Sequence, residues 1–158
     1  MLIQPTNPKP GSSQADGPAI QAGLFWPSID PLTARQAMRL DGTVTPQRLR
    51  AALVEAIASI NDKLSDWRRA QQAAGFMSLA SVPAEEVDGV SVLVQRWYRS
   101  VQCDAAANLA ERYRSFDSTA AGHKQADELD TTVYALRRYA RWAISDIRGD
   151  SRNVIEQI

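Results

Sequence analysis

The chain has 158 residues, of which 18 are Lys or Arg and 18 are Asp or Glu, and 44% are hydrophobic. A chain of this size and composition can bury one globular core, which excludes wholesale disorder. The zero net charge argues against nucleic-acid binding through a general basic excess. The single cysteine, Cys103, excludes an internal disulfide framework and indicates a reducing compartment.

No targeting or membrane-spanning segment is evident in the sequence. The N-terminal stretch MLIQPTNPKPGSSQADGP lacks the apolar run of a signal peptide. No other stretch approaches the ~18 consecutive apolar residues of a membrane span. We therefore expect a protein that is made in a cytoplasm and has no membrane partner.

Residues 1–23 are rich in Pro, Gly, Ser and Gln and contain almost no large apolar side chain. Because such a segment buries too little surface to offset its ordering entropy, we expect a flexible N-terminal arm. A compact apolar patch, residues 24–29, follows the arm. The pair Asp30-Pro31 is a helix cap followed by proline, and it predicts a short helix over residues 31–39.

Three longer helices follow in the predicted chain order. Residues 46–75, 90–113 and 126–149 each carry apolar side chains that recur every three or four positions, which is typical of amphipathic helices. Each ends at or before a glycine or another break. No run of residues alternates with a period of two, so we expect no β-strand.

These elements predict an all-α fold. Residues 24–149 are expected to form an antiparallel bundle of three long helices and one short N-terminal helix. The N-terminal arm, residues 1–23, and an extended C-terminal tail, residues 150–158, flank this helical domain.

No set of residues suggests catalysis or metal binding. His123 is the only histidine and lies in a predicted break, where a lone histidine is usually a surface residue. Cys103 has small alanines beside it and no activating partner nearby in sequence. The acidic group Asp127, Glu128 and Asp130 lies near a helix N-terminus, where negative charge is favourable without a metal. We therefore expect no enzymatic activity, no metal and no cofactor.

Arginine and aromatic residues intermingle in the last predicted helix. At about 100° per residue, Tyr134, Arg138 and Trp142 lie roughly opposite the apolar seam of that helix. Such mixtures are enriched in protein interfaces and also occur in nucleic-acid binders and in internal packing. We favour a subunit interface, while the other two interpretations stay open.

Several longer stretches resemble a known family in their order and spacing, from about residue 24 to the end of the chain. The family is that of the head-completion proteins (gpL type) of peduovirus-type temperate contractile-tailed bacteriophages. The stretches are FWPSIDP (25–31), RLDGTVTPQRLRAAL (39–53), AAGFMSLASVPAEEVDG (73–89), LAERYRSFDSTAAGHKQADELDTT (109–132), RRYARWAISDIRG (137–149) and the ending IEQI.

The resemblance implies a structural protein of the virion neck that is made in the host bacterial cytoplasm. It implies assembly as a ring of about twelve copies under the portal protein after DNA packaging. This ring would prepare the filled head for tail joining and contact a tail-side connector or tail-completion protein. Packaged DNA would pass through its channel without sequence-specific binding. The alternative function is that of a DNA-binding packaging factor, such as a small terminase-like or regulatory protein.

The C-terminal tail suggests a docking segment. Residues 152–158 follow a helix-terminating glycine and are mildly β-compatible. We hypothesise that they dock on the portal protein, by adding a strand to the edge of a sheet. The residues expected to make this contact are Arg152, Val154, Ile155 and Ile158.

Overall fold

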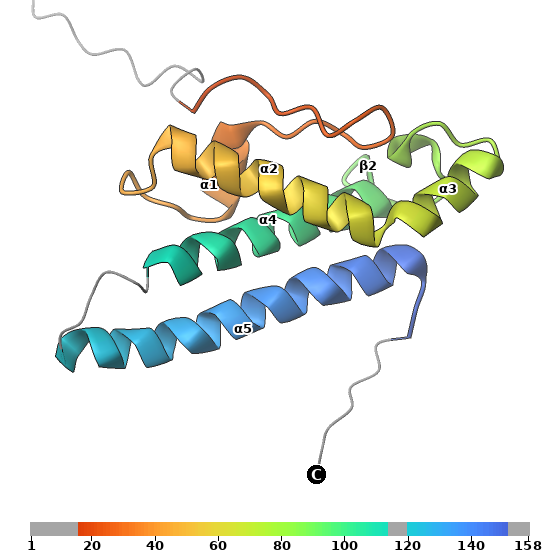
Figure 1. The fold of residues 1–158 in the computed structure, drawn as a ribbon. Coiled ribbons are helices and arrows are strands. Elements are labelled where there is room, and N and C mark those ends of the chain that lie inside the picture. The colour runs from red at the N-terminus through yellow and green to blue at the C-terminus, as the bar shows by residue number, and fades with distance from the viewer. Residues whose placement is uncertain (1–15, 114–119, 152–158) are drawn as a thin grey trace, which may run out of the picture.

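A computed structural model describes the backbone of residues 16–113 and 120–151, and the side chains of residues 16–112 and 132–151. The described part is mostly helical, as predicted, with one small sheet (Figure 1). In chain order the elements are α1 (Pro31–Ala37), α2 (Pro46–Lys63), α3 (Ser65–Ala73), the 3-10 helix η1 (Leu79–Ser81), β1 (Glu86–Val87), β2 (Val90–Ser91), α4 (Val92–Tyr113) and α5 (Ala120–Arg148).

The helix starts predicted from cap residues are confirmed. The Asp30 carboxylate accepts hydrogen bonds from the backbone N–H and the hydroxyl of Thr33, at 3.1 and 2.7 Å. These bonds hold the pKa of the Asp30 carboxyl below its ordinary value. At α2, the Thr45 hydroxyl accepts from the N–H of Arg48 at 3.3 Å. Both caps satisfy backbone donors that a helix start leaves unpaired.

The helix predicted over residues 46–75 is interrupted at Leu64, which separates α2 from α3. Leu64 is buried in the core, whereas α3 beyond it contains no buried residue. The carbonyl of Lys63 instead accepts a hydrogen bond from the Arg148 side chain, at the far end of α5. A tertiary contact thus lies at the interruption, and helical periodicity does not report it.

The prediction of no β-strand is wrong for residues 86–91. They form an antiparallel hairpin in which Val87 pairs with Val90, and α4 begins only at Val92. Asp88 and Gly89 both have left-handed backbone conformations, with φ of 56° and 71°. A two-residue Asp-Gly turn of this kind matches the twist of paired strands, which explains why a hairpin forms where we expected a helix start.

Residues 16–23 are packed against the helices, so the predicted start of the ordered domain at residue 24 is too late. Asp16 is buried and forms an ion pair with Arg35 of α1 at 2.6 Å. Ile20 is buried and exchanges two backbone hydrogen bonds with Ile29, at 2.7 and 2.9 Å. These long-range contacts order a segment whose composition alone indicates a flexible arm.

The centre of the core is Trp97 of α4, which is fully buried. Its ring stacks on Trp26 with centroids 5.8 Å apart. Its indole N–H donates to the side-chain oxygen of Asn61 in α2 at 3.0 Å, and Asn61 in turn donates to the Ala22 carbonyl. One side chain of α4 therefore joins α2 and the N-terminal segment into one core.

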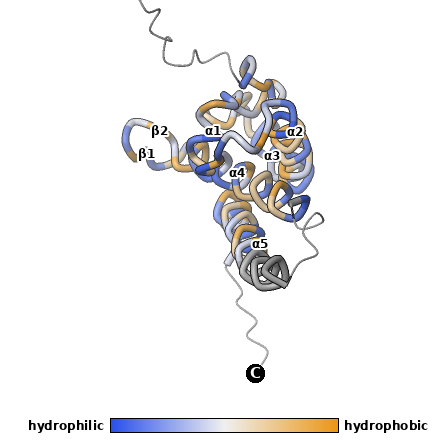
Figure 2. The backbone as a smooth tube through the Cα atoms, turned by 90° about the vertical axis from the view of Figure 1, so that its left-hand side faces the viewer, coloured by the Kyte–Doolittle hydropathy of each residue, from blue (hydrophilic) through white to orange (hydrophobic). Residues whose placement is uncertain are grey.

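Helix α4 is the middle layer of the molecule. The two views place α2 on one side of it and α5 on the other, with α5 running antiparallel to α4 (Figures 1 and 2). Helix α5 packs along α4 and has only slight contact with the other described elements. The predicted helical class is confirmed, and the three long helices α2, α4 and α5 lie in successive layers. Within the described ranges, no helix combines the length and apolar character needed to cross a lipid bilayer.

Candidate protein-interaction surface on helix α5

The inner face of α5 is the predicted apolar seam. Val133, Ala140, Ala143 and Ile147 are buried, and Ile144 joins them, whereas Leu136 is half-buried. These side chains pack on α4. On the opposite side of α5, Tyr134 is exposed, whereas Arg138 and Trp142 are half-buried. The side chains of residues 120–131, at the start of α5, lie outside the described part. They include Ala126 and Leu129, which the spacing of three and four also places in the seam.

The three residues predicted to form a second face of α5 come together in the structure. The guanidinium carbon of Arg138 lies 6.0 Å from the ring centroid of Tyr134 and 5.0 Å from that of Trp142. Tyr134 is 63% exposed, although it is large and aromatic. The trio therefore forms a continuous surface, as its helical spacing predicted.

Two further residues, Arg99 and Tyr139, belong to this surface, although the sequence-based prediction of the second face did not include them. The Arg138 guanidinium carbon lies 5.4 Å from the ring centroid of Tyr139, and the guanidinium of Arg99 in α4 lies over the same ring at 5.6 Å. Tyr139 lies on the flank of α5, next to Trp142, with ring centroids 5.9 Å apart. We call Arg99, Tyr134, Arg138, Tyr139 and Trp142 the arginine–aromatic cluster.

Only the sequence run Arg137-Arg138-Tyr139 hinted at Tyr139, since it places another aromatic beside the predicted face. Arg99 lies in a similar run, Arg96-Trp97-Tyr98-Arg99, but its place beside Tyr139 depends on how α4 packs against α5.

The cluster has unused hydrogen-bonding capacity. The Nε atom of Arg138 is buried and has no hydrogen-bond partner among the described residues. A guanidinium has five N–H donors in a planar fork that matches a carboxylate, and a buried donor without a partner costs free energy. The cluster therefore combines aromatic side chains with an arginine, the residue types found at energetically important interface positions.

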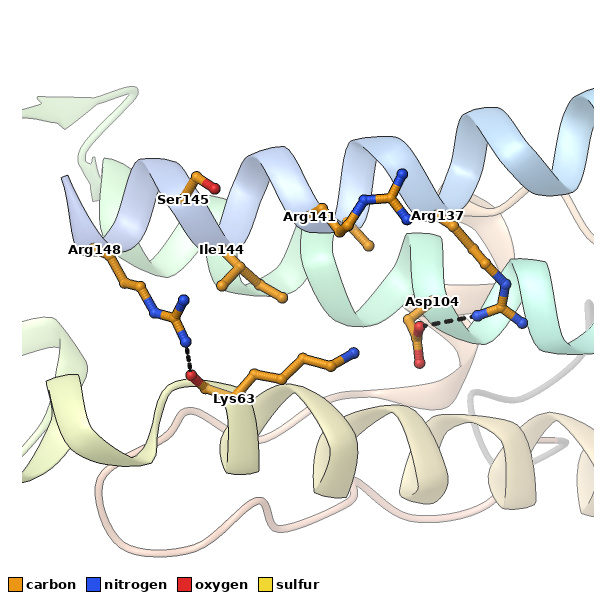
Figure 3. Close-up of a pocket in the computed structure, with 8 residues that line it drawn as sticks. Lys63, Asp104, Arg137, Arg141, Ile144, Ser145 and Arg148 are labelled. Carbon is orange, nitrogen blue, oxygen red and sulfur yellow. Dashed lines mark hydrogen bonds and ion pairs between the residues drawn. The ribbon is translucent and has the colours of Figure 1, made fainter. Parts of the chain in front are cut away.

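The other flank of α5 borders a polar groove. Arg137 spans from α5 to α4, with 3.5 Å to the Asp104 carboxylate, 3.1 Å to the Asn108 side chain and a second ion pair to Glu111. Asp104 is only 7% exposed, so Arg137 neutralises a nearly buried charge. Near the other end of the groove, Arg148 donates to the carbonyl of Lys63 (Figure 3).

Two kinds of reactive group bear on catalysis or metal binding in the described part of the chain: metal-ligating side chains and the single cysteine. No group of three or more His, Cys, Asp or Glu side chains within the described ranges could hold a metal ion. Cys103 is partly buried, and this burial raises the pKa of its thiol, although the nearby Arg99 opposes the shift. A thiol with a raised pKa is a poor nucleophile at neutral pH.

Several predicted residues lie outside the described part of the chain. They include the tail residues proposed to bind the portal and the side chains of the acidic group and the lone histidine. The tail residues are Arg152, Val154, Ile155 and Ile158. The backbone of His123, Asp127, Glu128 and Asp130 belongs to α5, so the break expected at His123 is wrong, and only the side chains of these four residues are outside the described part.

Comparison with known proteins places this chain in a family. Residues 20–158 match the family described as phage head completion protein (GPL). The chain belongs to the phage head completion protein (GPL) family. It is 44% identical over 143 residues to the head completion/stabilization protein of Escherichia phage P2, a match that covers 90% of this chain and 85% of that protein. No solved structure matches the chain.

The family resemblance inferred from the sequence is thereby confirmed. Phage head completion proteins are structural proteins of the phage head and are not known as enzymes. In a structural protein, the arginine–aromatic cluster and the polar groove are candidate surfaces for contacts with other proteins.

Replacing Arg137 with Met should lower the free energy of unfolding by about 2 kcal/mol, because Asp104 would keep its buried charge without a partner. Arg141→Met is the matched control, since Arg141 lies one turn away on α5 and makes no ion pair with a described residue. We expect it to change stability by less than about 0.5 kcal/mol. Urea unfolding measures both, and equal effects of the two variants would contradict the role of Arg137.

Proposed function

We propose that copies of this head completion protein assemble as a ring under the portal protein after DNA packaging and prepare the filled head for tail joining. The observation that carries this proposal is the one-sided attachment of α5. Its inner face packs on α4, while the arginine–aromatic cluster on its outer side includes the 63% exposed Tyr134. Such a surface suits a neighbouring protein.

A ring requires heterologous contacts, in which one surface of a copy meets a different surface of the next. The arginine–aromatic cluster is one such surface in the proposal, with Tyr134, Arg138 and Trp142 at the contact between copies. By analogy with rings at phage necks, we expect about twelve copies on the portal. A tail-side connector or tail-completion protein would bind the opposite rim, and packaged DNA would pass through the channel.

The double variant Arg138→Ala/Trp142→Ala should weaken ring formation on heads that carry the portal. Truncation of a central Arg or Trp in an interface typically costs about 2 kcal/mol or more per contact. The number of copies retained per purified head is the measurement, and far-UV circular dichroism checks that the helices persist. Arg69→Ala, on the exposed helix α3, is the control and should assemble normally. Normal assembly of the double variant would contradict the assignment of this surface.

The proposed portal contact involves the C-terminal tail. Deletion of residues 150–158 should abolish binding to the portal while leaving the helical domain folded, because Arg152, Val154, Ile155 and Ile158 would supply the docking strand. Binding to portal-bearing heads in a sedimentation assay tests this. Asn153→Ala/Gln157→Ala is the control, since it leaves those four side chains in place. Unchanged binding of the deletion variant would refute the docking role.

A further inference from the structure

The hairpin β1–β2 projects from the helical layers (Figure 2). Three acidic residues lie in it or directly before it. The side chains of Glu85, Glu86 and Asp88 are exposed, and none of them forms an ion pair with a described residue. Beside the turn, Val87 and Val90 are 52% and 43% exposed. The hairpin thus presents two apolar side chains among three unneutralised carboxylates.

The shape of the hairpin is fixed in advance of any contact. The side-chain amide of Gln95, in the first turn of α4, donates to the carbonyls of Val87 and Val90 at 2.8 and 2.9 Å. Asp88 and Gly89 adopt the left-handed conformations of a tight two-residue turn. A pre-organised projection loses little conformational entropy when it binds.

The groove between α2 and α5 has the opposite charge. It encloses about 340 Å³, and Ala140 and Ile144 contribute apolar surface to it. Its charged lining comprises four basic side chains and one acidic one: Lys63, Arg137, Arg141, Arg148 and Asp104 (Figure 3).

Positive charge remains in the groove after its internal pairing. Arg137 neutralises Asp104, its only acidic lining residue, at 3.5 Å. Lys63 and Arg141 form no ion pair with any residue that the structure describes. We call this space the basic groove.

The two features lie on different sides of the molecule. In the end-on view, the hairpin projects on one side of α4, while α2, whose last residue Lys63 lines the basic groove, lies on the other (Figure 2). One copy therefore cannot bring its own hairpin into its own groove. Two copies placed in the same orientation, side by side, can do so, and this relation is the heterologous contact that generates rings.

We propose that the hairpin β1–β2 of one copy docks into the basic groove of the next copy. Glu85, Glu86 and Asp88 would face Lys63 and Arg141, and the two valines would contact the apolar part of the groove. The proposal rests on the ring assembly proposed above and adds a specific contact between its subunits. Its basis is the charge complementarity of two surfaces that the structure leaves unpaired.

Charge reversal in both partners tests this contact. One variant carries Glu85→Lys, Glu86→Lys and Asp88→Lys, a second carries Lys63→Glu and Arg141→Glu, and a third carries all five changes. On portal-bearing heads, each of the first two should retain about tenfold fewer copies than wild type, because like charges then meet. The third variant should recover most of the loss. Arg68→Glu/Arg69→Glu, on helix α3, is the control and should assemble as wild type does.

Cross-linking gives a second readout that does not depend on ring stability. In a Cys103→Ser background, Asp88→Cys combined with Arg141→Cys should yield a disulfide-linked ladder of dimers, trimers and longer chains on oxidation of assembled heads. Either cysteine alone should give no products beyond dimers, because a single thiol per copy cannot extend a chain.

These experiments distinguish failure of the hairpin contact from failure of the proposed ring. Wild-type rings on the portal, together with no recovery in the five-residue variant and no ladder, would overturn the hairpin contact and leave the ring standing. If the groove variant lost assembly while the hairpin variant assembled normally, something other than the hairpin would occupy the groove. That result would also overturn the hairpin contact. The absence of wild-type rings would overturn both proposals.

Discussion

Helix α5 is held to the rest of the protein along one side only, and the organisation of the molecule follows from that constraint. Its apolar seam packs on α4, and two polar contacts reinforce this attachment: Arg137 reaches the nearly buried Asp104, and Arg148 binds the carbonyl at the end of α2. The remaining surface of the helix carries large aromatic and charged side chains, of which Tyr134 is exposed and Arg138 and Trp142 are half-buried. Exposed aromatic surface of this kind is typical of protein-contact sites.

Because α4 lies between α2 and α5, it is buried on two sides. Toward α2 it presents Trp97 and Val101, and the burial of Ser100, Asp104 and Ala107 shows that small and polar residues also lie inside. Small side chains let helices approach closely, and the one buried charge is neutralised by Arg137. The structural role of the family and the layered helices are therefore consistent with each other: α4 serves the internal core, and α5 is left available for contacts.

The sequence predicted those features that depend on local spacing. The caps at Asp30 and Thr45, the α5 seam and the meeting of Tyr134, Arg138 and Trp142 all follow from intervals of three or four residues. The sequence did not predict features that involve long-range contacts. Examples are the helix interruption at Leu64 and the ion pair that holds Asp16 against α1. The second buried side of α4 was missed because it is made of small and polar residues rather than an apolar stripe. The Asp-Gly hairpin carried a local signal that was assigned to a helix start instead.

The central claim is that the uncovered side of α5 becomes buried between copies at the neck. Cryo-electron microscopy of the neck in intact particles tests it most directly, because it shows each copy with its neighbours in place. The account predicts a ring in which the arginine–aromatic cluster of every copy is covered by an adjacent polypeptide, while α4 stays internal. A neck that lacks this chain, or a ring in which that side of α5 faces solvent, would contradict it.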